Sequence, residues 1–320
     1  MSRPLVVVVQ ARAGSTRLPR KVLADLGGRP MLALMLARLG PLAADGATVV
    51  VATTTAGRDD AVAGVAEGCG VKVVRGDEAD VLGRFAAVLA AHPADDVVRL
   101  TADCPLIDPV LVQEVVADHR RTGADYTSNT LVRTYPDGLD VEVLRADVLR
   151  RAVDDATGAD EREHVTPHVY RRPRTFTLAQ VTGDAPLGDE RWTVDDADDL
   201  DLVREAVAAL PDPVTAPWPD VLAALGSRPV RQPGDVVSRP AGAVDHRPGD
   251  PYMRRWKLFD HVSRNTLGEA TVAVDDGIGT LTIDLPDHAT DRRPAAVDAV
   301  RHRLRADLQV AHLHDPIGDR

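Results

Sequence analysis

The feature that most constrains the fold is the alternation of short valine-rich runs with helix-like segments. The runs are residues 4–9, 47–54, 71–74 and 96–103. Such continuous apolar runs are typical of strands buried on both faces of a sheet. The segments between them, which carry apolar residues at three- and four-residue steps, are residues 29–40, 58–70 and 80–92. Strand–helix alternation predicts right-handed crossovers and an α/β fold of three layers, with helices on both sides of a largely parallel sheet.

From about residue 125 the pattern changes. Residues 125–129 and 138–144 read as strands with no helix between them, so part of the sheet is expected to be mixed. Helices are then predicted at 146–156 and 161–170, a strand at 175–182, and a short strand end at 191–196. The next helix is expected to start at Ala197, with Asp195 or Asp196 near its N-terminus, where a carboxylate suits the helix dipole.

The C-terminal part has a different composition. Residues 228–251 are rich in proline and glycine and read as a linker or an extended wrapping segment. Beyond it, 252–320 is predicted to be a small α+β extension. It would contain a helix at 253–265, a hairpin at 269–285 and a final helix at 292–310. We expect it to pack against the main domain or a second subunit, and we predict a homodimer.

Charge and cysteine content limit the class of protein. The 320 residues carry a formal net charge of -11, which argues against general nucleic-acid binding and makes any local basic cluster informative. The two cysteines, Cys69 and Cys104, give neither a disulfide framework nor a metal-binding spacing. No stretch is long and apolar enough to cross a bilayer. We therefore expect a cytoplasmic protein without a membrane partner.

The segment from Gln10 to Leu23, QARAGSTRLPRKVL, concentrates cations directly after the first predicted strand. Its charged residues are Arg12, Arg17, Arg20 and Lys21. A glycine- and serine-containing loop at the carboxyl end of a buried strand is where open α/β sheets bind ligands, and its N–H groups and cations suit a triphosphate. The spacing is not that of a Walker A loop. A solvated basic loop accounts for the charges equally well at this point.

Two aspartates follow other predicted strands. Asp103 comes directly after a buried strand, and Asp195 follows the short apolar run before the helix at Ala197. Asp108 precedes a proline and is the better helix cap, which leaves Asp103 without a structural task. Carboxylates from two strand ends could share Mg²⁺, which usually takes one or two of them plus phosphate oxygens. Asp195 could equally be a charge at the helix N-terminus.

Five segments occur in an order that resembles a known family. They are residues 10–23, 100–109, 126–143, 161–170 and 191–203. Together, over Pro4 to Gly226, the chain resembles the spore-coat-polysaccharide cytidylyltransferases of the SpsF type, relatives of the CMP-Kdo and CMP-sialate synthetases. The resemblance implies that residues 1–227 form a nucleotidyltransferase domain of the glycosyltransferase-A-like fold. It also implies an enzyme that transfers CMP from CTP to a sugar or sugar-like acceptor, with Mg²⁺ as cofactor and pyrophosphate as product.

The resemblance also assigns residues by position. Arg12 and Lys21 would be catalytic, and Asp103 and Asp195 would bind the metal. The nucleotide would be bound by Gln10, Ala11, Arg12, Gly14, Ser15, Arg17, Lys21, Asp80 and Arg84. The acceptor would be bound by Asp137, Glu142, Glu163 and His164. Glu142, Glu163 or His164 could instead act as a general base, but a phosphate or carboxylate acceptor needs none, so we favour acceptor binding.

Other functions stay open at this point. The chain could be a nucleotidyltransferase for another base, or a nucleotide-sugar-dependent glycosyltransferase of the same fold. An Asp-x-Asp metal motif would favour the latter, and Asp196 to Asp198 has that form, but it lies late in the chain at a helix start. A non-catalytic nucleotide-binding protein is disfavoured, since both candidate metal ligands and the lysine are present.

Overall fold

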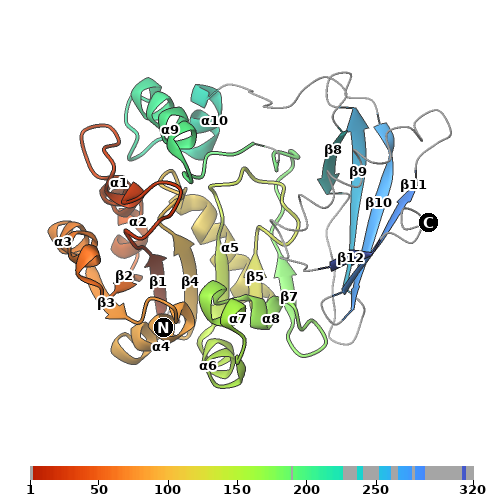
Figure 1. The fold of residues 1–320 in the computed structure, drawn as a ribbon, viewed down its shortest axis with the longest axis horizontal. Coiled ribbons are helices and arrows are strands. Elements are labelled where there is room, and N and C mark those ends of the chain that lie inside the picture. The colour runs from red at the N-terminus through yellow and green to blue at the C-terminus, as the bar shows by residue number, and fades with distance from the viewer. Residues whose placement is uncertain are drawn as a thin grey trace.

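The computed structural model describes residues 3–188, 190–225, 236–240, 252–260, 266–275, 278–284 and 312–314. The first part of the chain forms a seven-stranded sheet in the order β3-β2-β1-β4-β6-β5-β7 (Figure 1). Its strands are β1 (Leu5–Gln10), β2 (Thr48–Thr54), β3 (Lys72–Gly76), β4 (Asp96–Thr101), β5 (Tyr126–Ser128), β6 (Glu142–Arg145) and β7 (Leu178–Gln180).

Helices connect most of these strands. They are η1 (Lys21–Leu23), α1 (Met31–Arg38), α2 (Gly40–Ala44), η2 (Gly57–Asp59), α3 (Asp60–Gly68), α4 (Val81–Ala91), α5 (Pro109–Thr122), α6 (Ala146–Asp155), α7 (Ala159–His164), α8 (Pro167–Tyr170), α9 (Ala197–Ala209) and α10 (Trp218–Leu225). Strands β3, β2, β1 and β4 pair in parallel with one another, while β6 runs antiparallel to both β4 and β5. The predicted mainly parallel, mixed sheet is therefore confirmed.

Strand β1 shows why a continuous valine run suits the middle of the fold. Val7 and Val9 are fully buried in a cluster with α1, α5 and α9, while Val6 and Val8 are fully buried in a second cluster with α4, α6 and α8. Successive side chains of a strand point to opposite faces, so a strand covered on both sides needs apolar residues throughout. This arrangement is the predicted three-layer α/β fold.

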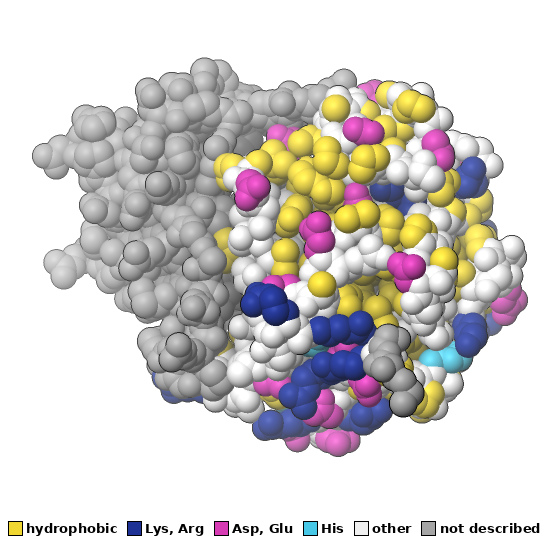
Figure 2. All heavy atoms as spheres, turned by 180° about the vertical axis from the view of Figure 1, so that it is seen from behind, with side chains coloured by type: hydrophobic (Ala, Val, Ile, Leu, Met, Phe, Trp, Pro, Cys, Tyr) yellow, Lys and Arg dark blue, Asp and Glu magenta, His cyan; other side chains and the backbone are white. Residues whose placement is uncertain are grey.

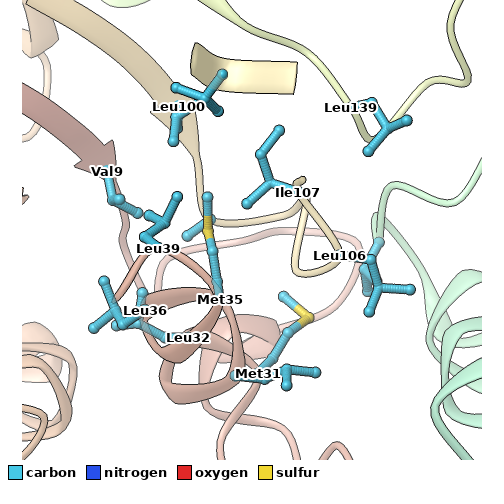
Figure 3. Packing of buried hydrophobic residues seen from close by; sticks show 14 of the residues in the cluster. Val9, Met31, Leu32, Met35, Leu36, Leu39, Leu100, Leu106, Ile107 and Leu139 are labelled. Carbon is cyan, nitrogen blue, oxygen red and sulfur yellow. The ribbon is translucent and has the colours of Figure 1, made fainter. Parts of the chain in front are cut away.

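One face of the sheet is packed by α1 and by the loop that follows β4. Figure 3 shows the side chains Met31, Leu32, Met35, Leu36 and Leu39 beside Val9 and Leu100. Leu106 and Ile107, from the loop after β4, lie in the same cluster and are fully buried. That loop is therefore fixed by core packing only a few residues after Asp103.

A buried arginine connects α1 to the chain around α9 and α10. The Arg38 side chain, 1% exposed, donates to the carbonyl oxygens of Ile107 at 2.8 Å, Pro213 at 2.6 Å and Ala216 at 2.9 Å. Asp108 caps α5 as predicted, accepting from Val110 N at 2.8 Å. Its second oxygen accepts from the N–H of Trp218, the first residue of α10, at 2.8 Å. These polar contacts fix the helices that follow Asp195.

The C-terminal part forms a five-stranded sheet in the order β12-β11-β10-β9-β8 (Figure 1). Its strands are β8 (Val236–Pro240), β9 (Tyr252–Asp260), β10 (Thr266–Asp275), β11 (Ile278–Asp284) and β12 (His312–His314). The predicted hairpin is confirmed as the antiparallel pair β10–β11. The predicted helix at 253–265 is wrong, because β9 occupies its first half and pairs with both β8 and β10, so backbone pairing overrides the helical spacing.

The other C-terminal predictions have mixed outcomes. Strand β8 lies within 228–251, so part of the predicted linker is paired in a sheet. The predicted helix at 292–310 lies outside the described residues.

None of the helices in the described part of the chain has the length and apolar character that crossing a membrane requires. On the face in Figure 2, Lys and Arg side chains gather in the lower part of the view, with Asp and Glu side chains beside them.

We expect Arg38→Met to lower the free energy of unfolding by roughly 3 kcal/mol or more, because three buried carbonyl groups would lose their donor. Urea titration of both proteins measures the difference. Arg150→Met, at an exposed position on α6, is the matched control and should change stability by less than about 0.5 kcal/mol. Equal losses in the two variants would contradict this role for Arg38.

Candidate active site

The site lies where the strand order reverses. From β1 the chain adds β2 and β3 on one side and then places β4 on the other, so the parallel neighbours β1 and β4 have their carboxyl ends at the same edge of the sheet. A crevice at such a point, outside the carboxyl ends of the strands, is where open α/β sheets bind ligands. The basic loop follows β1 and Asp103 follows β4, so both lie at this edge of the sheet.

The basic loop is held in one conformation by hydrogen bonds to its own backbone and to α3. The buried carboxylate of Asp59 accepts from Ala13 N at 2.6 Å. The Ala13 carbonyl accepts from the N–H groups of Ser15 and Arg20, both at 2.9 Å. The Ser15 hydroxyl accepts from Leu18 N at 3.3 Å, and Arg20 has a left-handed φ of 61° just before η1. The loop thus folds back and directs Lys21 toward the sheet.

Lys21 lies between the two predicted metal ligands. Its Nζ is 3.3 Å from Asp103 Oδ2 and 2.9 Å from Asp195 Oδ1, and it donates to the Val194 carbonyl at 2.7 Å. The carboxylates meet because Val194 N donates to the Asp103 carbonyl at 2.8 Å, which attaches the segment before α9 to the end of β4. Three residues that are far apart in the sequence therefore form one cluster.

The second oxygen of Asp195 is held by arginines. Oδ2 lies 3.0 Å from Arg17 and 2.8 Å from Arg191. Asp199 supports this arrangement, since its Oδ2 accepts from Asp195 N at 2.7 Å and from Arg191 at 3.2 Å. Partial burial alone would raise the pKa of Asp195, but Lys21, Arg17 and Arg191 outweigh it and lower that pKa below its usual value. Asp195 is therefore an ionised carboxylate at neutral pH.

Arg12 occupies a separate part of the crevice. Its guanidinium lies 3.7 Å from Glu78 and 3.8 Å from Glu163, and Glu78 also pairs with Arg58. Gly14 is tightly surrounded, because a Cβ at this position would lie 3.2 Å from both Arg58 Nε and Glu78 Oε1. The structure thus brings Arg12 to one predicted acceptor residue rather than to the cluster of Lys21.

Asp80 and Arg84 have structural partners at the start of α4. Asp80 caps the helix through Gly83 N at 2.9 Å and binds the Arg162 guanidinium at 2.9 and 2.7 Å. Burial alone would raise the pKa of Asp80, but the contacts with Arg162 and Gly83 outweigh it and lower that pKa. Arg84 is 1% exposed, and its Nη1 donates to the Asp77 carbonyl at 2.7 Å. Both side chains therefore shape the segment before α4.

Gln10 and Ala11 lie at the carboxyl end of β1 as predicted. Ala11 N continues the sheet by donating to the Ala52 carbonyl at 3.1 Å, which leaves this N–H unavailable to a base. Gln10 Oε1 accepts from Arg99 Nη2 at 3.4 Å. Gln10 is thereby connected to the buried polar group around Glu142.

Glu142 is enclosed by hydrogen-bond donors. It pairs with Arg99, and its Oε1 accepts from the hydroxyls of Tyr126 and Thr166, each at 2.7 Å. The residue is 8% exposed. These contacts engage both oxygens of the Glu142 carboxylate. The arrangement connects β4, β5, β6 and the start of α8.

Glu163 and His164 precede a strained turn. Val165 has φ 73° and ψ -57°, and Thr166 N donates to the His164 carbonyl at 2.9 Å, which makes Val165 the centre of a γ-turn. Such a φ is unusual for a β-branched residue and is costly unless the surroundings fix it. Here Val165 is fully buried. Glu163 is exposed, and the half-buried His164 lies 3.6 Å from Asp160.

Asp137 lies beside the segment that carries Asp195. Its N–H donates to the Glu190 carbonyl at 2.9 Å, and its carbonyl accepts from Trp192 N at 2.8 Å. Burial, with the nearby charges of Asp140 and Asp103, raises the pKa of Asp137 to about 6. Of the predicted acceptor residues, Asp137 is therefore the one placed toward the Asp103 side of the crevice.

Comparison with known proteins identifies the chain. The model of the cytidylyltransferase family matches residues 6–193, more than half of the sequence. The chain belongs to the cytidylyltransferase family. It is therefore an enzyme of the nucleotidyltransferase class. The family match ends two residues before Asp195, so the attachment of Asp195 to the site rests on the geometry described above.

Individual proteins are similar to this cytidylyltransferase in sequence or in structure. The spore coat polysaccharide biosynthesis protein SpsF of Bacillus subtilis is 31% identical over 212 residues, covering 62% of this chain and 85% of SpsF. An uncharacterized protein of Methanocaldococcus jannaschii is 35% identical over 203 residues, covering 63% of this chain and 82% of that protein. A cytidylyltransferase structure from Leptospira borgpetersenii superposes with a TM-score of 0.65 at 27% identity, covering 70% and 94% of the two chains.

Several residues of the site were not predicted from the sequence. Asp59 looks like an ordinary charge at a helix start, and its contact with Ala13 depends on how α3 packs. Arg191 gives no local signal. Asp199 could have been found, because Asp196 and Asp199 have the spacing of a capping box, and both of its hydrogen bonds are present at the start of α9.

We expect Asp137→Asn to stabilise this cytidylyltransferase at pH 8 by roughly 1–2 kcal/mol, a figure reduced because the Asp137 side chain is 33% exposed. An unfolded aspartate has a pKa of about 3.9, so the folded state binds the proton more tightly. The stability that Asp137 contributes is full below about pH 4 and is lost as the pH rises through about 6.

Urea titrations at pH 4 and pH 8 measure this dependence. The difference between Asp137→Asn and the parent should nearly vanish at pH 4. Asp154→Asn, at an exposed position on α6, should show no comparable dependence on pH. If Asp137→Asn were less stable than the parent at pH 8, the ionised Asp137 carboxylate would stabilise the folded protein, and the prediction would be wrong.

Proposed function

We propose that the protein transfers CMP from CTP to a sugar or sugar-like acceptor and releases pyrophosphate. The observation that carries this proposal is the cluster of Lys21, Asp103 and Asp195 at the switch point of the sheet. Arg12 and Arg17, from the same loop as Lys21, add positive charge at this edge. Cations and paired carboxylates at one crevice suit a nucleoside triphosphate with a divalent cation.

The carboxylate pair has the chemistry of a Mg²⁺ site. Asp103 and Asp195 supply hard oxygen ligands, and both already face one cation, the Lys21 ammonium. In the described part of the chain, no group of three or more His, Cys, Asp and Glu side chains is arranged to hold a metal. Two carboxylates with phosphate oxygens are a common protein contribution to Mg²⁺ sites. When bound, Mg²⁺ would neutralise charge on the phosphates.

The remaining groups would act by position and charge. An acceptor oxygen attacks the α-phosphorus, and the bond from that phosphorus to the bridging oxygen breaks. The electron pair leaves with pyrophosphate. Arg12, Arg17 and Lys21 would hold the phosphates in line and stabilise the charge that grows on the leaving group. Asp103 and Asp195 would hold the divalent cation.

The acceptor would be bound by Asp137, Glu163 and His164. Glu163 is exposed and His164 is half-buried, so polar groups of an acceptor could reach them, whereas Glu142 is buried and would act by supporting the surrounding strands. An acceptor that attacks through a phosphate, phosphonate or carboxylate oxygen has no proton to lose and needs no general base. The name of the relative SpsF supports a role in making a CMP-activated intermediate for polysaccharide or natural-product biosynthesis. The homodimer and the cytoplasmic location stay predictions.

We also propose that residues 1–227 form the catalytic domain. The alignment with the cytidylyltransferase structure from Leptospira borgpetersenii covers 94% of that chain but only 70% of this one. This difference supports a catalytic domain that is shorter than the full sequence. The range 252–320 would then be an addition to that unit.

Pyrophosphate release from each of the four nucleoside triphosphates, with Mg²⁺ and a panel of acceptors, tests the proposal. The panel contains acidic sugars, amino sugars, cyclitols, polyol phosphates and phosphonates. We expect CTP to be preferred and Asp103→Asn to lower kcat/KM by about 10²-fold or more, because one of two carboxylate charges would be lost from the site.

Two outcomes of this assay would contradict different parts of the proposal. A preference for UTP or ATP would contradict cytidylyl transfer. An unchanged rate for a folded Asp103→Asn would contradict the metal-binding role of Asp103. Asp154→Asn, which removes one exposed carboxylate from α6, should keep the parent activity.

A further inference from the structure

The Lys21 ammonium uses all of its hydrogen-bond donors within the protein. A lysine ammonium has three N–H groups and no acceptor. Here they are directed to Asp103 Oδ2 at 3.3 Å, Asp195 Oδ1 at 2.9 Å and the Val194 carbonyl at 2.7 Å. The Lys21 side chain is 11% exposed. In this state the lysine has no donor left for a phosphate.

Each of the two aspartates uses one carboxylate oxygen for other partners and the second oxygen for Lys21. Asp195 Oδ2 is bound by Arg17 and Arg191, which leaves Oδ1 to the lysine. Asp103 Oδ1 accepts weakly from Cys104 Sγ at 3.7 Å, and Oδ2 faces the lysine. A divalent cation shared by both aspartates would compete for these same oxygens.

The charged groups that pair directly with one another in the cluster are equal in number. Three carboxylates, Asp103, Asp195 and Asp199, face three cations, Lys21, Arg17 and Arg191. A divalent cation that arrived alone would displace an ammonium and would leave a local excess of positive charge. A triphosphate brings a charge of about -4 at the same time and removes this excess, while giving Lys21 a new acceptor.

We propose that Lys21 occupies the position of the divalent cation in the nucleotide-free protein and that the nucleotide releases it. Lys21 thereby excludes the cation from the empty site and makes its binding depend on the triphosphate. By thermodynamic linkage the cation must then strengthen nucleotide binding by the same factor. This inference rests on the proposed function for the identity of the nucleotide, CTP. The competition between lysine and cation rests on the contacts of Lys21.

Binding of Mn²⁺ to the full-length protein without nucleotide, followed by the electron paramagnetic resonance signal of free Mn²⁺, tests the competition. Mn²⁺ carries the charge of Mg²⁺ and binds similar oxygen ligands. We expect Lys21→Met to bind Mn²⁺ at least about tenfold more tightly than the parent, because the competing charge is gone. Lys21→Gln, which keeps a donor for the Val194 carbonyl, should behave in the same way and guards against misfolding of the first variant.

Lys72→Met is the matched control, since it removes the same charge from an exposed position on β3. It should bind Mn²⁺ like the parent. Addition of CTP without acceptor should tighten Mn²⁺ binding to the parent and to Lys72→Met by at least about tenfold, and should tighten it much less in the Lys21 variants.

Unchanged Mn²⁺ affinity in both folded Lys21 variants would overturn the inference, as would equal tightening by CTP with and without the lysine. The readout is separate from turnover. If no acceptor gives pyrophosphate but the Lys21 variants bind Mn²⁺ more tightly, the competition stands and the proposed function fails. If pyrophosphate is released but Mn²⁺ affinity does not change, the function stands and the inference fails.

Discussion

The parallel pairing of β4 beside β1 is the interaction on which the site depends. It places the end of β4, with Asp103, next to the basic loop that follows β1. The Asp103 carbonyl then binds Val194 N at 2.8 Å, so a segment from much later in the sequence reaches the same place. Without this pairing, Lys21 and the two carboxylates would have no common location, because each comes from a different connection.

Once these segments meet, electrostatics decides their arrangement. Close carboxylates repel one another unless a cation lies between them, and here the Lys21 ammonium supplies that charge. Arg17, Arg191 and Asp199 complete a network in which opposite charges alternate. In this network each charged group has a partner of opposite sign. Under the proposed function, a divalent cation and a triphosphate would therefore have to replace existing contacts.

Much of the fold could be predicted because it depends on local patterns. The valine runs identify the buried strands, and Asp108 before a proline identifies the start of α5. The spacing failed at 253–265, where backbone pairing with β8 and β10 makes a strand, since short amphipathic segments fit either structure. In the site, Lys21, Asp103 and Asp195 were predicted together. Asp59 was missed because its partner Ala13 lies far from it in the sequence, and Arg191 was missed because no local pattern marks its pairing with Asp195.

The sequence by itself determined the α/β class, the family and the position of Asp103 just after a buried strand. These features follow from apolar periodicity and from residue order, which are properties of the linear chain. Only the tertiary structure decided what each charged side chain binds. Asp80 caps α4 and pairs with Arg162, Glu142 is enclosed by donors, and Lys21 bridges the two carboxylates. Hydrogen bonds act over about 3 Å, so their partners are fixed by packing rather than by spacing along the chain.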